Sequence, residues 1–169
     1  MSKSSDTPAR EDLRLRPAVE PDLPRVREII IASFDGVTAN QLLEERYGQI
    51  GGRSWREWKA AEIERSFRGE SEAVLVAERA GTIVGVITYR LDQRRLIGTI
   101  GNNGVDPKFQ GQGIGTWMYE QVLAIFRESG MRFADVSTGL DDAAASARRA
   151  YEKVGFKPLT SSVRYFREL

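Results

Sequence analysis

The sequence contains no cysteine and no histidine. Without cysteine, the chain can form no disulfide, no thiolate zinc site and no cysteine nucleophile. Without histidine, it has no Ser-His-Asp triad and no imidazole metal ligand, and it lacks the side chain that titrates nearest to neutral pH. Any proton transfer must therefore use carboxylates, tyrosine, lysine, arginine, hydroxyl groups, the backbone or water.

The chain also lacks an excess of charge of either sign and any long apolar run. There are 25 basic and 24 acidic residues, for a net charge of +1, whereas binding to nucleic acid or an anionic membrane needs a strong basic excess. No stretch approaches the roughly 20 apolar residues that span a bilayer. Residues 1–12 are polar, without the apolar core of a signal peptide. We therefore expect a cytoplasmic protein that binds neither nucleic acid nor membrane, with a disordered tail over residues 1–12.

The remaining residues have the composition and patterning of one folded domain. Of 169 residues, 41% are hydrophobic and 29% are charged, which suffices for a buried core. Apolar periodicity and turn signals predict strands at 13–16, 73–80, 82–91, 96–105, 133–138 and 163–167, and helices at 21–34, 41–47, 54–68, 113–129 and 143–154. Strands interleaved with helices predict an α/β (α+β) sandwich over residues 13–169.

A glycine-rich turn, QGQGIG at residues 110–115, lies between the fourth predicted strand and the helix that follows it. Glycine lets backbone N–H groups approach a ligand, and the helix N-terminus adds a positive dipole end, so the turn favours an anion such as phosphate. An ordinary tight turn has the same spacing, so both interpretations stay open for this motif alone. The turn lacks the lysine of a Walker A loop, and Thr116 replaces the third glycine of a dinucleotide motif.

Two motifs together resemble the GCN5-related N-acetyltransferase (GNAT) family. Residues 105–115, VDPKFQGQGIG, are similar to its coenzyme A signature Q/R-x-x-G-x-G/A, and residues 147–156, ARRAYEKVGF, to its second hallmark A-x-x-x-Y-E-x-x-G-F. The order of the predicted elements also matches, so the resemblance covers residues 13–169. It implies the GNAT fold: a mixed, mostly antiparallel sheet flanked by helices, with a splayed strand pair that binds acetyl-CoA.

The resemblance implies where the cosubstrate acetyl-CoA binds, with no metal. The pantetheine arm would pair with the strand edge at Asn103, Gly104 and Val105. A backbone N–H near Val105 would stabilise the oxyanion that forms on the thioester carbonyl, and core packing is the alternative role for this residue. The pyrophosphate would lie on the backbone N–H groups of Gln110, Gly111, Gln112, Gly113, Ile114, Gly115 and Thr116.

Tyr151 matches the general-acid tyrosine of the family. When an amine attacks the thioester, coenzyme A must leave, and a phenol with a pKa of about 10 can protonate a thiol with a pKa of about 8.5 if it is held close. The spacing of Tyr151 with Ala147 and Val154 also fits simple packing on an apolar helix face. The Gly155-Phe156 pair that follows completes the family motif and favours the catalytic role.

Three features depart from the family pattern. Ala144 stands where many members carry an asparagine that contacts pantetheine, and Thr99 stands where histone-acetylating members carry a glutamate base. The absence of histidine also excludes a histidine base. The group that deprotonates the amine is therefore not identified, and a water molecule held by Asn102 or Asn103 is one hypothesis.

Residues 37–68 lie where acceptor specificity usually lies in this family, but their role stays open. Trp55 and Trp58 can line an acceptor pocket, form an oligomer contact or pack in the core. Arg148 and Arg149 can bind the 3′-phosphate of the coenzyme or simply face solvent. Four glutamates can attract a cationic amine or lie on solvated helix faces: Glu44, Glu45, Glu57 and Glu62.

The sequence therefore predicts an enzyme, an acetyl-CoA-dependent N-acetyltransferase that acts by direct transfer to a primary amine of a small molecule or peptide. The resemblance also makes a homodimer one expected assembly. A catalytically idle acyl-CoA-binding sensor or regulatory module is the alternative, and the residues at Ala144 and Thr99 are consistent with it. A domain that binds ATP or NAD through the glycine-rich turn would leave residues 151–156 unexplained.

Overall fold

The structure, a computed structural model, describes residues 12–70 and 72–169. The tail expected at residues 1–12 lies outside the described residues except for Asp12. The strands are β1 (Leu13–Pro17), β2 (Ala73–Arg79), β3 (Thr82–Asp92), β4 (Ile97–Val105) and β5 (Phe133–Val136). The helices are α1 (Leu23–Phe34), α2 (Ala39–Tyr47), α3 (Trp55–Phe67), α4 (Ile114–Glu128) and α5 (Ala145–Lys153). Every predicted element except the last strand is present, with shifted ends.

The five strands form one mixed sheet in the order β1-β2-β3-β4-β5. The first four strands pair antiparallel, and β4 and β5 pair parallel. The hairpin between β2 and β3 turns at Ala80 and Gly81, which both have positive φ, 48° and 77°. Two positive φ angles in succession give the tight turn whose twist matches the flanking strands, so β2 and β3 form a hairpin.

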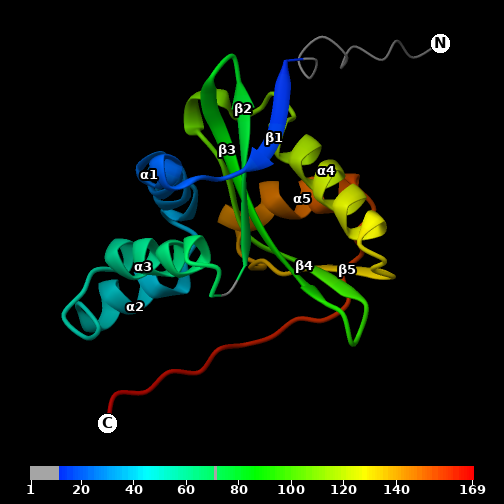
Figure 1. Ribbon diagram of the computed structural model, residues 1–169. Coiled ribbons are helices and arrows are strands. Elements are labelled where there is room, and N and C mark those ends of the chain that lie inside the picture. The colour runs from blue at the N-terminus through cyan, green and yellow to red at the C-terminus, as the bar shows by residue number, and fades with distance from the viewer. Residues whose placement is uncertain (1–11, 71) are drawn as a thin grey trace.

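Helices cover both faces of the sheet (Figure 1). Helices α1, α2 and α3 lie on one side, and α4 and α5 lie on the other. Successive strand residues point to opposite layers, as Leu75 and Ile87 pack toward α4 whereas Val76 and Val86 pack toward α1. Within residues 12–70 and 72–169, no helix has both the length and the apolar content to cross a membrane.

The strand predicted at residues 163–167 is wrong. These residues are exposed and pair with no described strand, and Figure 1 shows the C-terminal segment leaving the sheet. Alternation of apolar and charged residues produces a strand only where a neighbouring strand supplies hydrogen bonds. Here the segment reaches α2 instead, where the ring of Phe166 lies 5.3 Å from that of Tyr47.

Candidate active site

Strand β4 forms the centre of the site because its two neighbours pair with it over different lengths. Strand β5 pairs with β4 only from Ile97 to Ile100, whereas β3 continues to pair as far as Val105. Residues 101–105 therefore have one edge that β5 does not cover, and we call this the open edge. It contains the three residues that the resemblance assigns to the pantetheine arm.

A bulge in β4 turns two successive residues of the open edge toward α1 and α3. The register with β3 shifts at this point. A Cβ on Gly101 would collide with the carboxylate of Glu72, and Asn102 Nδ2 donates to Glu62 Oε1 at 2.8 Å. Asn103 then points to the opposite layer, so the two sides of the open edge present different chemistry.

On that opposite side, Asn103 connects two tyrosines. The Asn103 amide Nδ2 donates to the hydroxyl oxygen of Tyr151 at 3.3 Å, and the Tyr119 hydroxyl donates to Asn103 Oδ1 at 2.7 Å. Burial is the main cause that raises the pKa of Tyr119, and the neighbouring Tyr151 raises it further. The Tyr119 hydroxyl therefore keeps its proton and remains a donor. The Tyr151 hydroxyl therefore lies beside Asn103, at the open edge.

The glycine-rich turn adopts the geometry that its sequence indicates. Gly111 and Gly113 have φ of 76° and 77°, which glycine adopts without strain, and Gly113 is the N-cap of α4. The first N–H groups of a helix have no partner within the helix and lie at its positive end. Ile114 and Thr116 bury their side chains, so a ligand at this turn would meet their backbone.

The ten residues predicted to bind the cosubstrate thus lie in two neighbouring segments, the end of β4 and the start of α4. Side chains already hold part of this surface in place. Gln112 Oε1 accepts from Arg79 at 2.7 Å, and Gln110 Nε2 donates to the Val105 carbonyl at 3.1 Å. A pantetheine amide that uses the Val105 carbonyl would therefore share it with Gln110 or displace that side chain.

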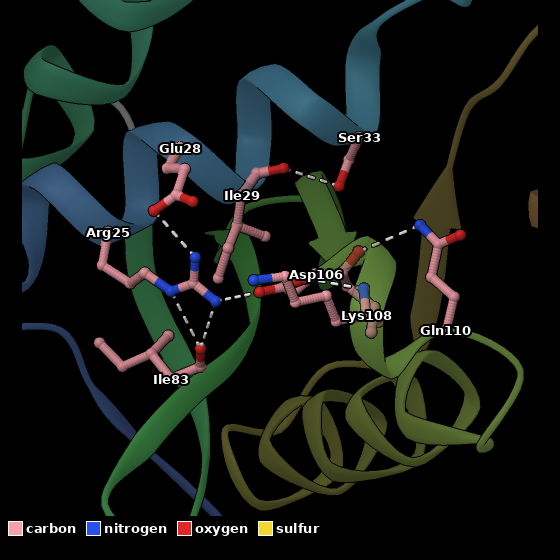
Figure 2. A network of polar contacts seen from close by, with 9 residues as sticks. Arg25, Glu28, Ile29, Ser33, Ile83, Asp106, Lys108 and Gln110 are labelled. Atoms are coloured by element: carbon pink, nitrogen blue, oxygen red, sulfur yellow. Dashed lines mark hydrogen bonds and ion pairs between the residues drawn. The ribbon is translucent and has the colours of Figure 1, made fainter.

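An ion-pair network ties the end of β4 to α1 (Figure 2). Arg25 pairs with Asp106, which directly follows β4, and donates to the Ile83 carbonyl at 3.2 and 3.3 Å. The second carboxylate oxygen of Asp106 accepts from the Lys108 N–H at 2.8 Å. Burial by itself would raise the pKa of Asp106, but the Lys108 N–H and the Arg25 guanidinium lower it. The network fixes the backbone from which the glycine-rich turn begins, and sequence analysis did not identify it.

A polar triad, in which Lys59 and Asn102 are buried and Glu62 is half-buried, joins α3 to the bulge on the α1 side of the sheet. Lys59 Nζ donates to Glu62 Oε2 at 2.8 Å and to Asn102 Oδ1 at 3.1 Å, and it lies 4.1 Å from the ring centre of Phe34. Burial by itself would raise the pKa of Glu62, but hydrogen bonds from Asn102 and Lys59 and the Lys59 charge lower it. Glu62 is therefore an anion at neutral pH. Lys59 was not predicted, and its i,i+3 spacing from Glu62 was the available signal.

Two solvent-open hollows meet at Glu62 and Arg65, which line both of them. The acidic hollow has a volume of about 400 Å³ and is lined by Glu62, Arg65, Ser66, Glu70 and Glu72. The basic hollow has a volume of about 270 Å³ and lies among α2, α3 and the C-terminal segment. It is lined by Asn40, Leu43, Glu44, Ile50, Arg53, Trp55, Trp58, Glu62, Arg65, Arg164 and Phe166.

The two tryptophans of α3 have different environments. Trp55 is 3% exposed and packs in the interior, and its backbone N–H donates to the Glu44 carboxylate. Trp58 is 40% exposed and faces the basic hollow, where its Nε1 donates to the Ile50 carbonyl at 2.8 Å. Of the two tryptophans, Trp58 is thus the one placed to contact a molecule in that hollow through an exposed ring.

Two of the other predicted candidates have structural partners. Glu57 completes a capping box with Ser54 at the start of α3. Arg148 donates to the carbonyls of Gly139 and Asp141, each at 2.7 Å, and so holds the loop before α5. Within the part of the chain that the structure describes, no three acidic residues are grouped so that they could hold a metal ion.

Comparisons with known proteins agree with this geometry. The chain matches the family model of the Acetyltransferase (GNAT) family over residues 26–156. No curated protein matches the chain.

Among solved structures, it is similar to the aminoglycoside N-acetyltransferase AAC(6′)-Iy in complex with a bisubstrate analogue, with TM-score 0.65, 13% identity and coverage of 93% of this chain and 99% of that one. It is also similar to a possible acetyltransferase from Clostridium difficile 630, with TM-score 0.64, 15% identity and coverage of 94% and 99%. A third is an aminoglycoside acetyltransferase from an uncultured soil metagenomic sample in complex with sisomicin, with TM-score 0.60, 19% identity and coverage of 94% and 97%. At these identities the likeness shows the fold.

Proposed function

The chain belongs to the GNAT acetyltransferase family, and we propose that it transfers an acetyl group from acetyl-CoA directly to a primary amine, with Tyr151 as the general acid. Residues 13–169 act together as one domain in this proposal. The observation that carries it is the position of the Tyr151 hydroxyl, which Asn103 holds at the open edge of β4.

The open edge and the start of α4 support the binding of acetyl-CoA. Extended backbone with an uncovered edge can pair with the amides of pantetheine, as a further strand would. The N-terminus of α4 offers backbone N–H groups and a positive dipole end to the pyrophosphate. In this arrangement the thioester reaches the bulge. The Tyr151 hydroxyl lies on the α5 side of the sheet there, and the carboxylates of Glu62 and Glu72 lie on the α1 side.

The chemistry needs one proton to arrive and one to leave. The amine nitrogen attacks the thioester carbon, a C–N bond forms, and backbone N–H groups of the open edge stabilise the oxyanion. The C–S bond then breaks, and Tyr151 gives its proton to the departing sulfur. The proton lost by the amine goes to a carboxylate or water on the α1 side of the bulge.

A pair of tyrosine variants tests this assignment. We expect Tyr151→Phe to lower kcat at least tenfold, because general acids typically contribute roughly 10²–10⁴-fold. Its affinity for acetyl-CoA should hardly change. Tyr119→Phe is the matched control, since it also removes a phenol from the Asn103 network but leaves the Tyr151 hydroxyl, and we expect a smaller loss. Unchanged turnover in Tyr151→Phe would contradict the role.

Binding of the cosubstrate is tested by thermal unfolding with acetyl-CoA, coenzyme A, ATP and NAD, each at about 1 mM. A ligand present at 100 times its Kd stabilises the native state by about 2.7 kcal/mol, which raises Tm by several degrees. We expect both coenzyme A forms to raise Tm and the other two to leave it unchanged. Acetyl-CoA consumption with a broad panel of small-molecule and peptide amines then separates an enzyme from an idle coenzyme A sensor.

A further inference from the structure

The two hollows that meet at Glu62 differ in charge, and we propose that they together bind one dipolar acceptor. Its primary amine enters the acidic hollow, and an anionic group, carried on an apolar body, enters the basic hollow. This inference rests on the proposed function and names the class of amine that the site accepts.

The amine end lies beside the bulge in β4. The carboxylate of Glu72 lies against Gly101 because no Cβ stands there, and it accepts from the Thr88 hydroxyl and from Arg90 at 3.2 Å. Glu62 reaches the same bulge through Asn102. Two carboxylates therefore flank the strand directly before Asn103, where they attract an ammonium group and can take its proton directly or through water.

The other end of the site is basic. Arg53, Arg65 and Arg164 line this hollow. Two glutamates also line it: Glu44 accepts from the Trp55 N–H, and Glu62 is the residue shared with the acidic hollow, so the three arginines outnumber the acids. Within the described residues, Arg53 and Arg164 form no ion pair. A carboxylate or phosphate in this hollow therefore meets the guanidinium groups of Arg53 and Arg164, which can bind it through charge-assisted hydrogen bonds.

Aromatic side chains form the walls between which an apolar body fits. Trp58 is 40% exposed and Phe166 is 46% exposed, which leaves ring surface uncovered in the basic hollow. The Arg53 guanidinium lies 5.1 Å from the centre of the Trp58 ring, so aromatic surface and positive charge are adjacent. The ring of Phe166 packs against that of Tyr47. The C-terminal segment thereby supplies one wall of the acceptor site.

The arrangement discriminates against polycations. An acceptor with a second ammonium group would place it among the arginines of the basic hollow, where like charges repel. The first ammonium group would still be attracted to Glu62 and Glu72. The site therefore distinguishes acceptors by the charge at the end that does not react.

Matched acceptors test the inference. We would measure kcat/KM at saturating acetyl-CoA for the dipeptide Gly-Phe and its C-terminal amide, for tyramine phosphate and tyramine, and for sisomicin. In at least one pair, we expect kcat/KM of the acceptor with the anionic group to exceed that of its partner without this group tenfold or more, which is about 1.4 kcal/mol. The pair that shows the larger ratio identifies carboxylate or phosphate as the anion.

Variants tie that preference to the basic hollow. The double variant Arg53→Gln with Arg164→Gln is expected to lower the ratio of kcat/KM within the acceptor pair at least fivefold, mainly through KM. Arg94→Gln, on an exposed turn, is the control. Glu72→Gln is expected to lower kcat/KM for acceptors with and without the anionic group alike. Glu64→Gln is the control, because Glu64 on α3 pairs with Arg27 of α1, and it should not lower kcat/KM.

The outcomes separate the two proposals. Three results would overturn the dipolar acceptor inference while leaving the acetyltransferase proposal in place. They are equal kcat/KM for acceptors with and without the anionic group, a preference for sisomicin, and a ratio that the double arginine variant does not change. No transfer to any of these or other amines, despite a rise in Tm with acetyl-CoA, would overturn the proposed function and this inference with it.

Discussion

Lys59 offers a quantitative test of how α3 holds β4. Only 8% of its side chain is exposed, and its ammonium group bonds Glu62 and Asn102. Lys59→Met keeps most of the side-chain volume but leaves Glu62 with Asn102 alone. Removing one partner of a buried ion pair costs about 3–5 kcal/mol. Because 39% of the Glu62 side chain is exposed, water replaces part of the lost interaction, and we expect a loss of about 2 kcal/mol.

The assay is thermal and urea unfolding of a double-mutant cycle. For a domain of this size, a loss of about 1 kcal/mol lowers Tm by roughly 2–4 °C, so Lys59→Met should lower Tm by about 4–8 °C. Glu62→Gln and the double variant complete the cycle. The double variant should be more stable than the sum of the two single effects predicts, by about 1 kcal/mol, because each single change leaves a partner unpaired. Lys153→Met, at the exposed end of α5, is the control.

The same variant has a pH signature. The pKa of Glu62 in the folded protein lies below the ordinary glutamate value of 4.5. Its ionisation therefore adds stability that is complete above this value and is lost as pH falls through the lower folded pKa. In Lys59→Met this dependence should weaken. A Tm within about 1 °C of the wild type, or strictly additive effects in the cycle, would refute the view that this pair stabilises the packing of α3 on β4.

Three further predictions concern other parts of the site. Gly104→Ala places a Cβ on Ser33 of α1, so we expect the free energy of unfolding, measured in urea, to fall by about 1–3 kcal/mol. Ser33→Gly should restore part of this loss. A Gly104→Ala variant as stable as the wild type would argue against this close approach. The pKa of Asp106 is lowered, so Asp106→Asn should lose stability at neutral pH and show a weaker fall of Tm as the solution is acidified. Parallel curves of Tm against pH for the variant and the wild type would contradict a contribution from its pair with Arg25. Deleting residues 163–169 should raise KM for the acceptor without changing the thermal shift by acetyl-CoA, and loss of that shift would show that the segment serves the fold instead.

Local patterns in the sequence were sufficient to predict most elements and the conformation of several turns and helix ends. The hairpin at Ala80-Gly81, the capping box at Ser54 and the glycine-rich turn all depend on residues that are close together in the chain. Steric limits on φ and the hydrogen bonds of helix ends act over a few residues, so a sequence shows them directly. The position of Tyr151 on a helix, and its motif, were visible for the same reason.

The remaining features depend on contacts between distant residues. Lys59 lies 43 residues from Asn102, and Arg25 lies 81 residues from Asp106, so no local pattern indicates either pair. The bulge that turns Gly101 and Asn102 to one face follows from pairing with β3. Residues 163–167 carry a strand pattern but form no strand, because a strand needs a partner that only the folded sheet can provide. Arg164 and Phe166 of this segment line the basic hollow instead.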